Sequence, residues 1–195
     1  MKKLSTYLFL VFFSFSASSF AESIRDLEIG GMSLGDSLLD YFSEKEILTN
    51  QPYLEMEKGK IFKTVSFYEN ISSERYDGVS IMYKDKNNKF IIHKLKGVII
   101  YSNNIKDCYS KKNEITKDLS VLFKDKEWKN SEYKDDDGFF SFSLKSLEEG
   151  TISISCYDWS NQITEEKKWS DNLRVTIETK EYTKWLSEQD TIYSD

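Results

Sequence analysis

Residues 105–123, IKDCYSKKNEITKDLSVLF, and residues 151–156, TISISC, carry the strongest structural signal in this chain. In the first stretch, apolar residues recur at spacings of three, four and seven, which is typical of one face of an amphipathic helix. In the second, Ile152, Ile154 and Cys156 alternate with polar residues, which predicts a strand with one buried face. A helix packed on a sheet is therefore the expected centre of the fold.

Each of these stretches contains one of the two cysteines, Cys108 and Cys156. Both cysteines fall on the apolar side of their element, so both thiols should point into the core. In an exported chain this arrangement predicts one disulfide that pins the helix to the sheet. A nucleophilic or redox-active thiol would need a base or a second cysteine close by, and the sequence shows neither.

Outside this centre, apolar residues alternate with polar ones in several further stretches, which favours a sheet with most of its strands consecutive along the chain. Strands are expected within residues 61–67, 79–83, 90–101, 128–133, 140–144, 152–156 and 173–177. A first helix is expected from Ser33, which can cap it with Asp36 three residues on, and it should break or restart at Ser43. Residues 157–170 are predicted as a loop, residues 183–189 as a short helix, and Gly97 as a possible bulge.

This order, α-β-β-β-α-β-β-β-β, predicts an α+β fold with a largely antiparallel sheet and two main helices packed on one face. Residues 22–195 are expected to form a single domain. Its two halves, 30–102 and 103–195, share the order of their elements without residue-level identity, so a duplication stays a hypothesis.

The N-terminus has the three parts of a secretory signal peptide: Lys2 and Lys3, an apolar run over residues 7–15, and small residues that end at Ala21. Cleavage after Ala21 would place the mature protein in the periplasm or outside the cell. The apolar run is too short to span a membrane, and no later stretch approaches the ~20 apolar residues that a membrane helix needs.

The composition excludes several classes of function. The chain has 195 residues, with 27 Lys and Arg against 33 Asp and Glu and a formal net charge of −6. This acidic balance argues against a nucleic-acid partner, because phosphate binding needs a concentrated positive surface. A single histidine, His93, rules out metal sites built from two or three imidazoles. A metal site made of carboxylates alone stays an open alternative, and the sequence predicts no metal and no cofactor.

The string Gly35-Asp36-Ser37-Leu38 resembles the nucleophile block of the GDSL (SGNH) esterases. That resemblance implies a small exported serine esterase or lipase with Ser37 as nucleophile and His93 as the only available base. The family has an Asp-x-x-His pair near its C-terminus, whereas His93 lies in the middle of this chain and has Phe90 three positions before it. The competing interpretation is a helix N-terminus with Ser33 as its cap.

Residues 29–47, IGGMSLGDSLLDYFSEKEI, also look like the start of uncharacterised small secreted bacterial proteins with a GMSxGDSLLDYFS-type opening after a signal peptide. The Gly-Met-Ser start is similar, over three residues, to that of the SmpA/OmlA lipoproteins of outer-membrane assembly. That second resemblance implies a small antiparallel-sheet binding domain, but the lipid-bearing cysteine of those proteins is missing here.

The second half of the chain is rich in aromatic residues, and an exposed subset could bind sugars or a protein. We expect a binding surface at Tyr157, Trp159 and Trp169, together with the acidic hairpin at Asp136, because loops on a stapled scaffold often carry recognition. The sequence therefore favours a monomeric, non-catalytic binding domain that acts on an envelope protein, with the serine esterase as the alternative.

Overall fold

The computed structural model describes residues 23–51, 61–68, 75–84, 89–102, 104–124 and 127–192. The predicted signal peptide, residues 1–21, lies outside these ranges. In chain order the elements are the 3-10 helices η1 (Ile24–Asp26) and η2 (Leu38–Asp40), then α1 (Glu44–Thr49), β1 (Phe62–Phe67), β2 (Gly78–Lys84), β3 (Ile91–Ile100), α2 (Ile105–Leu122), β4 (Lys129–Lys134), β5 (Gly138–Ser146), β6 (Gly150–Trp159), α3 (Asn161–Lys167), β7 (Asn172–Thr179) and α4 (Lys180–Ile192).

The strands form one antiparallel seven-stranded sheet in the order β1-β2-β3-β7-β6-β5-β4. The predicted α+β class is confirmed, and the seven strands occur in the expected order. The strands of the first half join those of the second through pairing of β3 with β7, so a single hydrogen-bonded sheet crosses the boundary between the halves.

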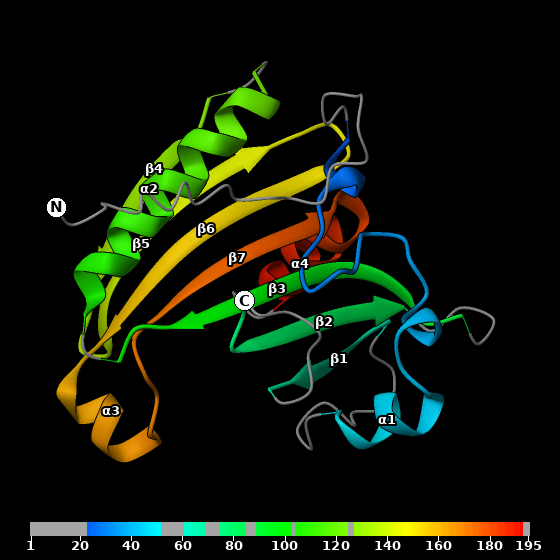
Figure 1. The fold of residues 1–195 in the computed structure, drawn as a ribbon, viewed down its shortest axis with the longest axis horizontal. Helices are drawn as coiled ribbons and strands as arrows, with labels where there is room; N and C mark the ends of the chain where they lie inside the picture. Colours follow the sequence, from blue (N-terminus) through cyan, green and yellow to red (C-terminus); the bar gives the residue numbers. More distant parts are fainter. Residues whose placement is uncertain are drawn as a thin grey trace, which may run out of the picture.

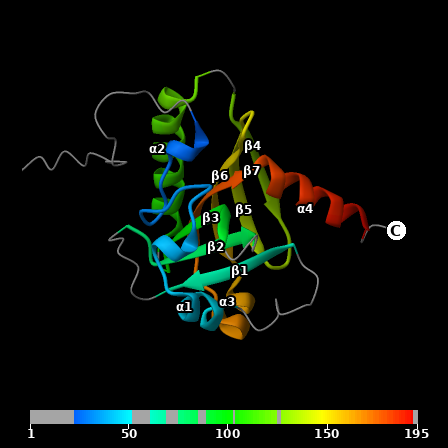
Figure 2. The same ribbon diagram turned by 90° about the vertical axis from the view of Figure 1, so that its right-hand side faces the viewer.

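The two faces of the sheet carry different helices. The helices α1 and α2 lie on one side, while α4 leaves β7 on the other side (Figures 1 and 2). Buried apolar residues from α1, α2 and the strands form one cluster on the first side, which we call the core face. It includes Ile47 from α1, Leu119 from α2 and Ile154 from β6, each at most 1% exposed.

A disulfide links α2 to the centre of the sheet, as predicted. Cys108 in α2 and Cys156 in β6 are both fully buried, and their Cα atoms lie 6.0 Å apart. The core face becomes polar toward β5, where Ser141 takes the register position next to Cys156. Lys112 in α2 is buried here, and its Nζ atom donates to Ser141 Oγ at 2.7 Å. The serine hydroxyl thus gives the buried ammonium group a hydrogen-bond acceptor.

The predicted helix from Ser33 is wrong. The chain makes tight turns here because Gly30, Gly31 and Gly35 have φ angles of 65°, 78° and 94°, a region that glycine adopts without strain. After these turns, helical structure resumes with the 3-10 helix η2 and then with α1, where Ser43 and Glu46 form a capping box. The predicted restart at Ser43 is therefore the true start of the α-helix.

Two smaller expectations also differ from the structure. Gly97 is in regular register with Val79 and Val175, and the irregularity on β3 falls opposite Met82 and Tyr83 instead. The predicted loop at 157–170 begins with the last residues of β6 and contains α3, which Ser160 caps by accepting from the backbone N–H of Ile163. The predicted helix at 183–189 is the middle of the longer α4.

Candidate functional site

Aromatic side chains gather on the face of the sheet opposite the core face. Side chains in a strand alternate between the two faces, so Tyr157 and Trp159 must point away from the side that Cys156 occupies. Register pairing places Tyr133 of β4 next to Phe140 of β5, and Phe140 next to Tyr157 of β6. We call this surface the aromatic face and define it by Tyr133, Phe140, Phe142, Tyr157, Trp159 and Trp169.

The rings of the aromatic face pack against one another around Phe140. The centroid of Phe140 lies 5.2 Å from those of both Tyr157 and Trp159, with the rings steeply inclined to each other. Trp169, which follows α3, lies 4.7 Å from Trp159. Phe140 is buried by its neighbours, whereas Tyr133 is 57% exposed and Trp169 is 48% exposed. The cluster therefore has a packed centre and an exposed rim.

The helices leave this part of the sheet accessible. The helix α4 begins after Thr179, which pairs with Gly150 at the far end of β6 from Trp159. The short helix α3 borders the same end of the sheet as Trp159 (Figure 1). Among the described elements, none lies over the exposed rings of Tyr133 and Trp169.

The acidic hairpin lies beside the aromatic face. The carboxylate of Asp135 accepts from the backbone N–H groups of Asp137 and Gly138 at 2.9 and 3.1 Å, which holds the turn at Asp136. The backbone N–H of Ser160, next to Trp159, donates to the carbonyl of Asp137 at 2.7 Å. Three of the four predicted surface residues thus form one ring cluster, and the turn containing the fourth, Asp136, is hydrogen-bonded to its edge. No group of acidic, histidine or cysteine side chains in the described ranges could hold a metal ion.

Sequence reasoning missed the members of the aromatic face that come from β4 and β5, and it missed Arg174 of β7. The guanidinium of Arg174 lies over the ring of Tyr157, with its Cζ atom 3.5 Å from the ring centroid. Alternation shows which residues of one strand share a face, but it does not show which strands are neighbours. The alternation of Phe140 and Phe142 with serine predicts that these phenylalanines lie on the core face, and this prediction is wrong. Ser141 pairs with Cys156 on the core face, so both phenylalanines lie on the opposite face.

Ser37 and His93 make separate hydrogen bonds. The hydroxyl of Ser37 donates to the carbonyl of Lys89 at 2.6 Å, and it caps η2 by accepting from the backbone N–H of Leu39. The Nδ1 atom of His93 lies 3.0 Å from Thr179 Oγ1, and burial lowers the pKa of the imidazole. The structure does not bring this serine and this histidine into hydrogen-bond contact, which is the geometry that a nucleophile and its base require.

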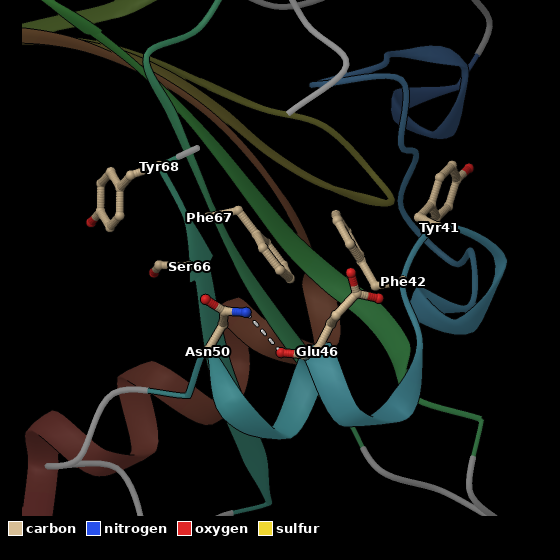
Figure 3. Close-up of a pocket in the computed structure, with 7 residues that line it drawn as sticks. All are labelled: Tyr41, Phe42, Glu46, Asn50, Ser66, Phe67 and Tyr68. Carbon is tan, nitrogen blue, oxygen red and sulfur yellow. Dashed lines mark hydrogen bonds between the residues drawn. The ribbon is translucent and has the colours of Figure 1, made fainter. Parts of the chain in front are cut away.

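A hollow of about 490 Å³ lies between α1 and β1 (Figure 3). It is lined by Tyr41, Phe42, Glu46, Asn50, Ser66, Phe67 and Tyr68. Phe42 and Phe67 stack with their centroids 3.9 Å apart, and Tyr41 and Tyr68 lie on either side of this stack. The carboxylate of Glu46 accepts from the backbone and hydroxyl of Ser43, which lowers its pKa. The carboxylate of Glu46 is therefore already engaged in the N-terminal capping box of α1, and the remaining lining is mostly aromatic.

Comparisons with known proteins do not identify a relative: no family model, curated protein or solved structure matches this chain. Within the described residues, no helix has both the length and the apolar composition needed to cross a membrane.

Proposed function

We propose that this chain is an exported, non-catalytic binding domain whose aromatic face docks on a protein of the cell envelope. The observation that carries this proposal is the exposed rim of the aromatic face, on a part of the sheet that the described helices leave open. Large exposed apolar patches on soluble domains often mark interaction sites, because leaving them in water is unfavourable.

The composition and geometry of the face favour a protein partner over a sugar chain. Tryptophan, tyrosine and arginine are the residues most enriched at the energetic centres of protein interfaces. The two tryptophans do not form one flat platform for a sugar ring, since Trp159 is tilted by 57° from Trp169. The only nearly parallel pair among the rings of the aromatic face is Tyr133 and Phe140, at 18°, and Phe140 is buried.

Site-specific photocrosslinking tests this proposal in the cells that export the protein. A benzophenone side chain at position 133 should attach the chain to one envelope protein, because Tyr133 is on the exposed rim. Trp169→Ala should reduce the yield of that product about tenfold, as expected for an interface residue worth more than 1 kcal/mol. Tyr41→Ala is the matched control, since Tyr41 is an exposed aromatic residue outside the aromatic face.

The possible outcomes separate the two candidate surfaces. A product that is unchanged by Trp169→Ala would contradict the proposal, and a product from a benzophenone at position 41 in place of one from position 133 would assign the partner to the hollow between α1 and β1. The absence of any product from position 133 would also count against the aromatic face.

The alternative, a serine esterase, has less support from the geometry. The hydroxyl of Ser37 is engaged with the Lys89 carbonyl, and the imidazole of His93 is engaged with Thr179. Labelling by a fluorophosphonate probe that disappears in Ser37→Ala would restore this alternative and would contradict a purely binding role.

A further inference from the structure

Arg174 lies on β7 beside the aromatic face, among neutral neighbours. Its register partners are Val98 on β3 and Ser155 on β6. Its Nε atom donates to Asn172 Oδ1 at 2.8 Å, and its guanidinium stacks on the ring of Tyr157. Burial in these surroundings lowers the pKa of the guanidinium, although an arginine stays charged at any physiological pH.

Two other cations on this side of the sheet, Lys94 and Lys84, have carboxylate partners. Lys94 of β3 pairs with Glu178 of β7, with 3.0 Å between Nζ and Oε2. Lys84 of β2 pairs with Glu181 of α4 at 2.6 Å. Within the described ranges, Arg174 has no carboxylate within salt-bridge distance. Arg174 is half-buried, and a charge that is partly withdrawn from water is stabilised when an anion packs against it.

The ring of Trp159 lies close to Arg174, with its centroid 5.9 Å from the Cζ atom of the guanidinium. The Nε1 atom of Trp159 is buried, so a partner at this position would meet the face of the ring and not its N–H group. A guanidinium group only donates hydrogen bonds, so the group that suits Arg174 is an acceptor with negative charge. A carboxylate fits best, because its two oxygens match the planar fork of an arginine.

We infer that the partner is a protein segment that presents an Asp or Glu side chain to Arg174, flanked by apolar side chains that contact Trp159 and Trp169. This inference rests on the proposed function and specifies the chemistry of its partner. We expect the flanking residues to be apolar because they would lie against the rings of Trp159 and Trp169, which pack together with their centroids 4.7 Å apart. The acidic turn at Asp136 disfavours further carboxylates of the segment at that edge of the face.

Selection from a random peptide library displayed on phage tests this inference without knowledge of the natural partner. The purified wild-type chain should enrich peptides with one Asp or Glu next to aromatic or aliphatic residues. A synthetic copy of the strongest binder should lose roughly 10- to 100-fold in affinity when its acid is replaced by the matching amide, because a charged hydrogen bond is lost. In Arg174→Gln, the acidic and amide peptides should bind equally.

Two results would overturn the inference in distinguishable ways. Peptides that bind the wild type and fail to bind Trp169→Ala, yet show no preference for an acid, would refute the role of Arg174 and leave the proposed function standing. Peptides that bind Trp169→Ala as well as the wild type, or a selection without binders, would refute both. The acid-to-amide comparison uses the unmodified protein, so it holds even if Arg174→Gln fails to fold. Arg174→Lys should recover only part of the preference, since lysine keeps the charge without the planar fork.

Discussion

Removal of the disulfide should destabilise this domain by about 4 kcal/mol. Cys108 and Cys156 are 48 residues apart, and closing a loop of this length in the unfolded chain lowers its conformational entropy by an amount worth about 4 kcal/mol at 25 °C. Single domains are stable by only about 5–15 kcal/mol in total. The double variant Cys108→Ala/Cys156→Ala should therefore lose a large share of its stability, and partial unfolding at 37 °C is expected.

Urea unfolding followed by tryptophan fluorescence measures this loss at pH 7. The double variant should have a lower midpoint than the oxidised wild type, and a slightly steeper dependence on urea because its unfolded chain is more expanded. The wild type in a reducing agent should match the double variant within about 1 kcal/mol, the cost of the small volume lost at the two buried sulfurs.

The same reasoning predicts where the structure loosens first. Among the described residues α2 contacts the sheet through the buried side chains of Cys108, Ile115 and Leu119. Hydrogen exchange of the α2 amides should accelerate more than that of β7. A reducing agent added to the double variant is the control and should change nothing. A loss below about 1 kcal/mol in both the reduced protein and the double variant would refute the chain-entropy argument.

Three further predictions concern single positions. Gly97→Ala should cost about 1–3 kcal/mol in urea unfolding, because a Cβ atom there would lie 2.4 Å from the ring of Tyr76; an unchanged midpoint would show that the ring moves away freely. Burial lowers the pKa of His93 below its usual 6.5, so the folded state binds fewer protons than the unfolded state. The free energy of unfolding should therefore fall as the pH drops below about 6.5, and His93→Gln should flatten this part of the wild-type curve. Burial also lowers the pKa of Lys112, which donates to Ser141, so the folded state loses this proton at a lower pH than the unfolded state does. The wild type should therefore become more stable relative to Lys112→Met as the pH rises toward about 10.5, the pKa of lysine in the unfolded chain. A constant difference between these two proteins from pH 7 to about 10.5 would contradict the buried-charge explanation.

The strands, α2 and the disulfide could all be predicted because their signals are local. Ile152, Ile154 and Cys156 lie on the core face of β6, as their alternation with serine and threonine indicates. The spacing of Cys108 and Leu119 likewise places both on the buried side of α2. Apolar side chains are stabilised when they are removed from water, so the spacing at which they recur shows which face of β6 and of α2 is buried.

The errors arose where backbone conformation or a distant contact overrides a local pattern. Ser33 and Asp36 have the spacing of a helix cap, and the carboxylate of Asp36 does accept from the backbone N–H of Ser33 at 2.8 Å. The positive φ of Gly35 then turns the chain away from a helix. Gly97 leaves room for the ring of Tyr76, which is a long-range packing contact that a pattern within one strand does not reveal.

By itself, the sequence determined the class of the fold, the order of its strands along the chain and the pairing of its two cysteines, because each depends on local periodicity or on the presence of only two partners. Only the tertiary structure decided that β3 pairs with β7 and that Phe140 lies between Tyr133 and Tyr157. It also decided that Arg174 lies over Tyr157, with no acid to pair with it among the described residues. Such contacts join residues far apart in the chain, and they depend on which strands become neighbours when the whole sheet minimises its exposed apolar surface.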